Sequence, residues 1–393
     1  MTGQPAWGSF TAGVALGAFG IVFAGVAAVT VQFSSTTRAA SGLAAAVLGL
    51  AFVLSGVGNM LGTADASGVR LVSSWPAWLS PTGWGQQMRP FGGDHWWPLG
   101  LSAVAFVVLV WAAGALAARR DVGRGILAER RGHADATPAL LSPLGLVWRL
   151  QRGALLAWGV GMLGFGLVFG AIIDEVAGSS AATREWYARM GGSDQILDSY
   201  RASMIEMAGM AVAIYTVQML LRIRADESEG PLEPVLATAV SRGQWLMSHV
   251  VNAALGAFAL LLVFALSMAL TAGSVLGDIP AQVLDMLVAG VVQLPGIMVI
   301  GAVVVAVTAL LPRWAASVSW SVVIVAILLG PLFGAATMQL PEWTQNLSPF
   351  THVAKAPAAD VTAVPVVALI AISVALAIAG LAAFRRRNLA LPA

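Results

Sequence analysis

The chain of 393 residues contains no cysteine, a single lysine and few charged residues. Without cysteine it can form neither a disulfide nor a thiolate metal site. A Walker A loop needs a Gly-Lys-Ser/Thr step to hold phosphates, and the one lysine, Lys355, stands between two alanines. The chain therefore cannot itself be a P-loop ATPase. Its four histidines lack metal-ligand spacing and are interpreted as lone interfacial or loop residues, and Gly-x-Ser-x-Gly is absent. The sequence indicates no enzyme.

Hydrophobic residues dominate instead. They make up 58% of the chain, while 10% is charged, against roughly 25% charged in a soluble domain. A helix needs about 20 apolar residues to cross a ~30 Å hydrocarbon core, and the apolar runs here lack the alternation of transmembrane strands. We therefore predict an all-α integral membrane protein with nine transmembrane helices. The runs cover residues 11–33, 39–61, 99–118, 153–173, 204–221, 246–272, 285–311, 315–336 and 363–384.

The basic residues between these runs predict an orientation. If the arginines at 385–387 lie inside, fifteen of the 21 Lys and Arg residues fall on the inner side, as the positive-inside rule requires. This places the N-terminus outside and the C-terminus in the cytoplasm of a multi-pass plasma-membrane protein. The net charge of +2 gives no indication of nucleic-acid binding.

A partial internal repeat divides the chain. Residues 24–43 resemble residues 302–321, and Pro-x-Trp, Leu-Ser-Pro and a terminal run of arginines then follow in the same order in both copies. The second copy has six predicted spans and the first only the last three, a 3+6 arrangement. Ser142 and Pro143 begin a predicted interfacial helix before the second copy. The predicted domains are 1–118 (three spans and an outer Trp-rich loop), 119–152 (a cytoplasmic linker with the interfacial helix) and 153–393 (six spans).

The most polar interruption between two apolar runs is residues 222–245, RIRADESEGPLEPVLATAVSRGQW. Four carboxylates fall within eight residues of it and arginines bracket them. Gly230 and Pro231 predict a turn, and proline is tolerated at the first position of a helix because its missing N–H would be unpaired there. We expect a bent cytoplasmic loop that carries a short helix across the ends of the spans.

This segment resembles the coupling-helix segment of type 2 ABC exporter permeases, in particular the branch described as polyketide-antibiotic (tetronasin-type) exporters. Pro231 departs from the arginine that this family usually has after the glycine. The interfacial helix at Ser142 likewise resembles the elbow helix of the family. The matching residues are Arg224, Glu227, Gly230, Glu233, Leu236, Ala237, Val240, Ser241 and Arg242.

The resemblance implies a permease subunit that exports hydrophobic or amphiphilic, antibiotic-like compounds using ATP hydrolysed by a separate subunit. Coupling to that ATPase, present in two copies, would involve Glu227, Glu229, Gly230, Glu233 and Arg242. ATP and Mg would bind to the partner, so no cofactor is expected in this chain. Because permeases of this family have two six-span halves, we also expect that the chain lacks its first three spans.

Two other classes stay open: a secondary, ion-coupled transporter and a non-transporting membrane scaffold that binds no ATPase. A secondary transporter needs ionisable groups within the membrane. Carboxylates such as Glu206 and Asp285 are expected within about a turn of the outer boundary, where they reach water, which favours a partner ATPase. Gln218 and Gln293 are polar residues in apolar spans, where they either bond between helices or line a substrate path.

Overall fold

All nine apolar runs are helical in the computed structural model, which describes residues 6–34, 37–64, 71–119, 137–178, 181–191, 195–228 and 232–387. Within these residues, nine helices are long and apolar enough to cross a membrane. The predicted all-α membrane fold is therefore confirmed. The chain divides into two units, residues 1–134 and 135–393, which are described separately.

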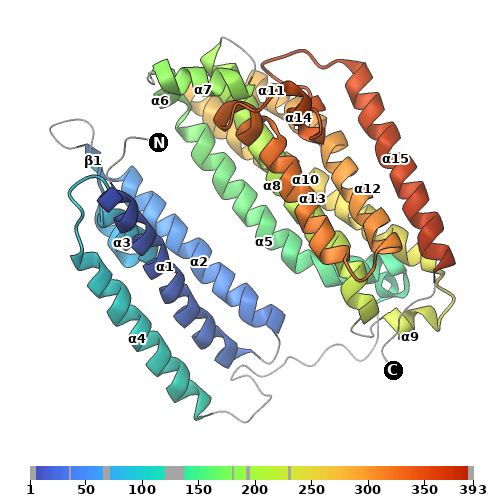
Figure 1. Cartoon of the computed structure of the whole chain (residues 1–393), viewed down its shortest axis with the longest axis horizontal. Coiled ribbons are helices and arrows are strands. Elements are labelled where there is room, and N and C mark those ends of the chain that lie inside the picture. The colour runs from blue at the N-terminus through green and yellow to red at the C-terminus, as the bar shows by residue number, and fades with distance from the viewer. Residues whose placement is uncertain are drawn as a thin grey trace. The chain divides into compact units, whose positions relative to one another are not determined.

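The first unit is built on three long helices. α1 (Ala6–Phe33) lies between α2 (Thr37–Met60) and α4 (Trp97–Ala117) and packs along both (Figure 1). A Cβ atom at Gly58 would lie 2.6 Å from the methyl group of Ala77, so glycine lets the α2–α4 connection lie directly on α2. That connection contains β1 (Thr63–Ala64), β2 (Leu71–Val72), η1 (Trp75–Leu79) and α3 (Pro81–Gln87).

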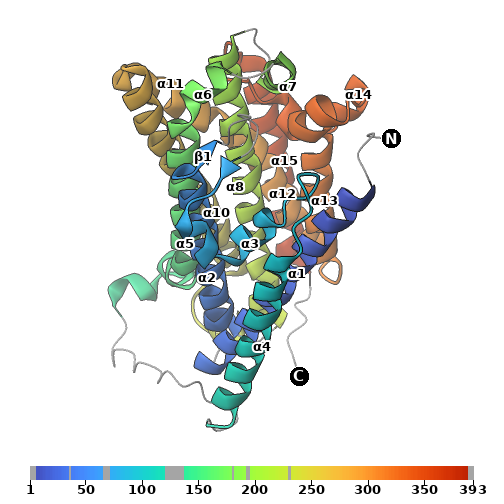
Figure 2. The ribbon, with the colours of Figure 1, turned by 90° about the vertical axis from the view of Figure 1, so that its left-hand side faces the viewer.

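The second unit surrounds the long helix α8 (Ile196–Ser228), the most buried of the nine. α5, α10, α12 and α13 all pack against it, with α5 at one side of the unit and α15 at the other (Figure 1) and with α6 and α7 near one end (Figure 2). The short α7 and α9 lie at opposite ends, which we call the α7 end and the α9 end. Besides α8, the elements are η2 (Pro138–Leu141), α5 (Pro143–Ala171), α6 (Ile173–Ala177), α7 (Ala181–Gly191), α9 (Leu232–Leu236), α10 (Arg242–Leu276), α11 (Ile279–Val292), α12 (Leu294–Leu310), α13 (Ala315–Leu329), a π-helix (Pro331–Thr337), α14 (Glu342–Gln345), η4 (Pro349–His352) and α15 (Ala363–Arg386).

Glycines bring α5 and α10 into backbone contact. A Cβ atom at Gly166 would lie 2.7 Å from the carbonyl oxygen of Phe264, and one at Gly170 would overlap the hydroxyl of Thr271. Small residues allow helices to approach closely in membranes, where van der Waals packing drives their association. α5 therefore depends on these two glycines to hold its place on α10.

The Leu-Ser-Pro motif has the same role in both units. The hydroxyl of Ser80 donates to the carbonyl of Ala51 in α2 at 2.6 Å, and the hydroxyl of Ser348 donates to the carbonyl of Ala326 in α13 at 2.7 Å. Each serine also caps the short helix that follows it. The repeat predicted from sequence therefore has a structural counterpart at these two positions.

Three segments differ from the sequence expectation. The run 285–311 is divided between α11 and α12 at Gln293, because Pro295 has no N–H to continue the helical hydrogen bonds. The interfacial helix expected after Ser142 is the beginning of the continuous α5, although Ser142 caps it as predicted. α8 continues through Glu227 to Ser228, so the start of the expected loop is helical.

Candidate functional site

The short helix α9 has one buried side and one exposed side. Leu232 is fully buried, in an apolar cluster with Val147 of α5 and Trp245 of α10. Glu233 and Pro234 are exposed. The predicted short helix is therefore present, fixed to two long helices by its apolar side, and it carries a carboxylate on its free side.

A capping box fixes the chain between α9 and α10. The Ser241 hydroxyl accepts from the N–H of Gln244 at 3.3 Å, and the Gln244 side chain accepts from the N–H of Ser241 at 2.9 Å. This reciprocal pair satisfies two backbone donors at the beginning of the helix. The next residue, Arg242, donates to the carbonyl of Arg387 at 2.9 Å, so the beginning of α10 is joined to the end of α15.

Glu227 lies inside this end of the unit and is only 1% exposed. Its carboxylate pairs with Arg387 and, at 3.4 Å, with Arg224. The Arg387 guanidinium also lies 4.9 Å from the centre of the Phe384 ring. A buried ion pair offsets its desolvation only when its geometry and other hydrogen bonds are good. Because Glu227 belongs to α8 and Arg387 follows α15, their pair ties the end of α8 to the end of α15.

A second polar cluster lies beside it. The Nε2 amide of Gln151 is 3.1 Å from Nδ1 of His249, and Nε2 of His249 is 3.6 Å from Asp226. Because an amide nitrogen donates, Nδ1 accepts, and the imidazole hydrogen on Nε2 faces the carboxylate. Arg222 lies 3.7 Å from the other Asp226 oxygen, and the Trp245 ring lies 4.7 Å from the imidazole. The cluster joins α5, α8 and α10.

The interpretation of His249 as a lone interfacial or loop residue is wrong, because it is fully buried within this cluster. Its partners come from helices up to 98 residues away in the chain. The available signal was a histidine one turn after Trp245 in an otherwise apolar run, which does not identify the partner.

The predicted coupling residues occupy different environments. Glu233 is exposed, Arg242 is half-buried and Glu227 is buried. Glu229 and Gly230 lie outside the described residues. Glu227 and Arg242 therefore hold the ends of α8, α10 and α15 together, and Glu233 is the described member that can contact a partner directly.

The two glutamines proposed for a substrate path lie apart. Gln218 is exposed on α8 and accepts a hydrogen bond from the Trp158 indole of α5 at 3.0 Å. Gln293 is 2% exposed, and its side-chain oxygen has no hydrogen-bond partner among the described residues. That oxygen would be 2.8 Å from a Cβ atom at Gly209, so it lies against the backbone of α8. Gln218 thus forms a hydrogen bond between two helices, which is one of the two roles predicted for it.

Glu206 is buried in α8, about 15 Å along the helix from its first residue, and is 5% exposed. The expectation that it reaches water is therefore wrong. One of its oxygens has no hydrogen-bond partner among the described residues. Lys355 lies nearby, with its ammonium group 3.4 Å from the carbonyl of Arg189. Burial lowers the pKa of Lys355, and the charge of Glu206 opposes that shift.

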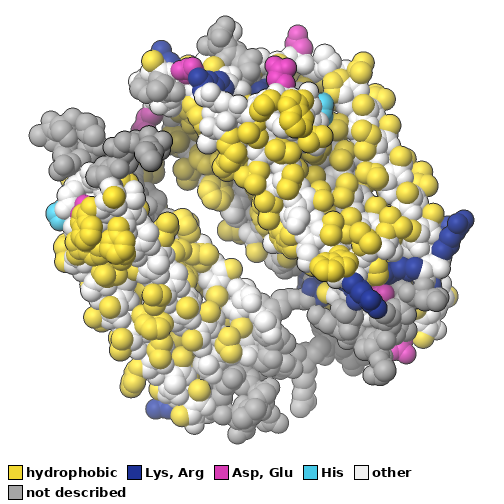
Figure 3. All heavy atoms as spheres, in the orientation of Figure 1, with side chains coloured by type: hydrophobic (Ala, Val, Ile, Leu, Met, Phe, Trp, Pro, Cys, Tyr) yellow, Lys and Arg dark blue, Asp and Glu magenta, His cyan; other side chains and the backbone are white. Residues whose placement is uncertain are grey.

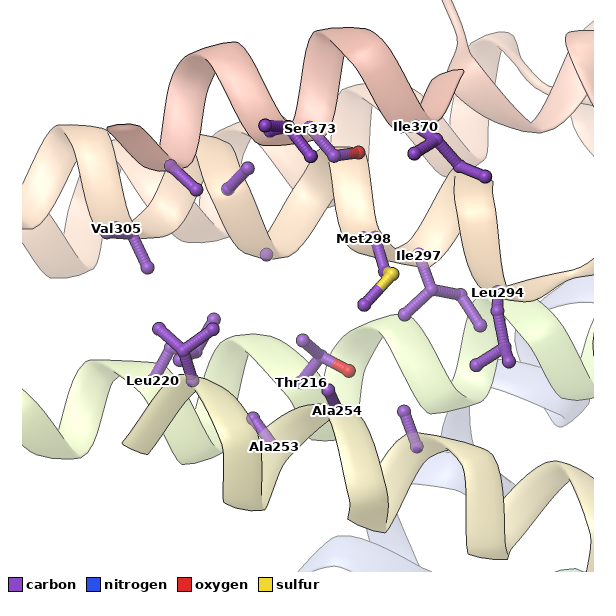
Figure 4. Close-up of a pocket in the computed structure, with 16 residues that line it drawn as sticks. Thr216, Leu220, Ala253, Ala254, Leu294, Ile297, Met298, Val305, Ile370 and Ser373 are labelled. Atoms are coloured by element: carbon purple, nitrogen blue, oxygen red, sulfur yellow. The ribbon is translucent and has the colours of Figure 1, made fainter. Parts of the chain in front are cut away.

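A cavity of about 160 Å³ separates α8 and α10 from α12 and α15 (Figure 4). Leu220 and Thr216 of α8 face Val305 and Met298 of α12 across it, and Ser373 of α15 lies beside them. None of the described residues that line it is charged. Sequence reasoning missed this site because each helix contributes only apolar or hydroxyl residues, as the core does.

The sides of the second unit are largely covered by hydrophobic side chains, while Lys and Arg side chains gather near its ends (Figure 3). This is the distribution expected of a protein with a hydrocarbon layer around its middle. The space-filling view thus agrees with the nine apolar helices in indicating a multi-pass membrane protein.

Comparison with known proteins gives the family. Residues 140–385 match the family described as "Multidrug efflux system permease Rv1217c, C-terminal domain". The chain is also 39% identical over 387 residues to the multidrug efflux system permease protein Rv1217c of Mycobacterium tuberculosis (strain ATCC 25618 / H37Rv). That similarity covers 97% of this chain and 68% of the relative. The polar cluster around His249, the anchored α9 and the apolar cavity all lie within residues 140–385, and the chain belongs to the Rv1217c family of multidrug efflux permeases.

Proposed function

We propose that this permease is the membrane subunit of an ABC exporter and moves hydrophobic or amphiphilic compounds out of the cell with ATP hydrolysed by a separate subunit. The observation that carries the proposal is α9, a short helix with Leu232 buried between α5 and α10 and Glu233 exposed. ATP and Mg would bind to the partner, which would be present in two copies. The resemblance of residues 222–245 to the tetronasin-type coupling segment supports the same assignment.

The contacts of α9 suggest how a partner acts on the membrane spans. A force on α9 acts on α5 through Val147 and on α10 through Trp245, because all three elements share one apolar cluster. α10 and α8 are in turn joined to the end of α15 by the contacts of Arg387. In this proposal the α9 end faces the cytoplasm, and ATP binding and hydrolysis at the partner act on these four helices through α9.

An ion-coupled transporter is the second candidate, and Glu206 is the observation that favours it. A carboxylate that is 5% exposed within a predicted span is the kind of group that carries a coupled proton. Efflux that persists after ATP depletion, collapses with a protonophore and is lost in Glu206→Gln would favour this candidate. Efflux that follows ATP and survives Glu206→Gln would exclude it.

Charge reversal within residues 222–245 tests the ABC proposal; the variant at Glu229 and Glu233 is called the α9 double variant because Glu233 lies on α9. Glu229→Lys with Glu233→Lys should weaken ATPase association by several kcal/mol if the contact is partly desolvated, mainly through faster dissociation. Glu233 is exposed, so reversing its charge should cost the fold little. The matched control reverses two exposed carboxylates on segments outside α9, Glu342 and Asp360.

The readout is the amount of ATPase that copurifies with each permease, with the permease level in the membrane measured alongside. We expect a strong loss of ATPase for the α9 double variant and none for the control. Equal recovery from the wild type and the α9 variant, at equal membrane levels, would refute the docking role.

A further inference from the structure

The cavity between α8 and α10 on one side and α12 and α15 on the other has an almost entirely apolar lining. Among the lining residues that the structure describes, only Thr216 and Ser373 carry a polar side-chain atom apart from the sulfur of Met298. Thr216 donates its hydroxyl to the carbonyl of Val212 at 2.9 Å, and Ser373 donates to the carbonyl of Leu369 at 2.8 Å. Since each hydroxyl hydrogen is engaged, both oxygens can only accept from an occupant.

The cavity opens to the side of the unit. Three of its lining residues lie at the surface: Met298 is 42% exposed, Ile370 is 45% exposed and Val374 is 51% exposed. They belong to two of the apolar helices that can cross a membrane. In a bilayer, an opening between two such helices would face hydrocarbon, and an occupant could then enter the cavity without crossing water.

Volume and polarity define the occupant. A cavity of about 150 Å³ lined by apolar side chains holds one benzene molecule, and the volume here is similar. The site therefore accommodates one aromatic ring or a short branched alkyl group, while the rest of a larger compound stays in the bilayer. An ionised group inside would lose its hydration without gaining a charged partner, which strongly disfavours its binding.

We propose that this cavity binds the uncharged aromatic or branched alkyl end of an exported compound that arrives from the bilayer. Binding in the cavity follows from its geometry, whereas export of the bound compound rests on the proposed function. Two walls come from α8 and α10, the helices on either side of α9, and the other two come from α12 and α15. An occupant would thus contact α8, α10 and α15, which the contacts of Arg387 join at the α9 end.

Photolabelling tests binding without requiring transport. The full chain is placed in phosphatidylcholine vesicles, without ATP or any partner, and exposed to an iodophenyl trifluoromethyl diazirine, which is a single apolar ring. Labelling of lipid-facing residues rises in proportion to the probe concentration, whereas labelling of a binding site saturates. We expect labelling within 294–305 and 370–377 that excess iodobenzene suppresses. Labelling there that iodobenzene leaves unchanged would mean that lipid tails fill the cavity, and would overturn the proposal.

Matched variants on α15 locate the site. Ala377 lines the cavity and Ala375 does not, so Ala377→Phe should abolish the saturable labelling and Ala375→Phe should preserve it. Ile370→Trp offers a second test at the rim, where overpacking is small. Its control is Ile372→Trp, since Ile372 has a similar exposure of 49% and lies outside the lining.

Export assays with the same variants separate the two proposals. Saturable labelling with no ATP-dependent efflux would refute the proposed function and leave the binding site standing. ATP-dependent efflux of apolar aromatic compounds that is unchanged in Ala377→Phe, although the saturable labelling is lost, would show that export does not use the cavity. Parallel loss of labelling and efflux in Ala377→Phe and Ile370→Trp supports both.

Discussion

Removal of the Arg387 side chain should destabilise the second unit. Arg387→Ala deprives the Glu227 carboxylate, which is 1% exposed, of its pair with the end of α15. Breaking a buried pair costs about 3 to 5 kcal/mol when the remaining charge has no partner. Arg224 remains 3.4 Å from Glu227, and the Arg387 side chain is itself 13% exposed, so we expect about 2 to 3 kcal/mol.

The assay is thermal unfolding of the purified chain in detergent, with Arg386→Ala as the control. Arg386 is the exposed neighbour of Arg387, and its removal should leave the melting temperature within about 1 °C of the wild type. The double variant Glu227→Gln with Arg387→Ala should recover part of the loss, because the charge that Arg387 neutralised is then absent. Equal melting temperatures for Arg387→Ala and Arg386→Ala would refute the claim that this pair ties α8 to α15.

Three further predictions concern the stability of the second unit. Gly170→Ala places a methyl group into α10 and should cost about 1 to 3 kcal/mol, whereas Gly164→Ala, with open space around it, should be nearly neutral; the melting temperatures of both variants check this. Gln218→Leu removes the acceptor of an indole N–H and should lower stability by about 0.6 kcal/mol, measured by unfolding in mixed micelles. Burial lowers the pKa of Lys355 below 10.5, so the folded chain loses this proton before the unfolded chain does. Its contribution to stability should rise with pH between the lowered value and 10.5, and Lys355→Met should flatten that rise in a pH series of melting temperatures.

Periodicity and composition predicted the membrane helices because the cost of burying backbone polar groups in lipid leaves few other folds. The ends of the helices were less predictable. Glu227 was expected in a solvated loop, but α8 continues through it, because arginines from α8 itself and from the distant α15 neutralise the carboxylate. Sequence spacing shows the first of these partners and gives no information on the second, 160 residues away.

The candidate site was likewise predictable from the sequence only in part. Residues 222–245 indicated a short helix with an exposed carboxylate, and α9 with Glu233 has that form. The cavity could not be predicted, because apolar residues such as Leu220 and Val305 look the same whether they fill a core or line a space. The depth of Glu206 also depended on packing, since its carboxylate is enclosed by neighbouring helices.

Site-specific crosslinking tests most directly whether α9 docks on an ATP-binding subunit. Benzoylphenylalanine replaces Glu233 in a permease expressed together with its candidate ATPase, and a second chain carries the same photoreactive residue at the exposed Glu342 in α14. We expect a light-dependent adduct with the ATPase from position 233 and none from position 342. No adduct from position 233 at normal membrane levels of both subunits, or equal adducts from both positions, would contradict the claim.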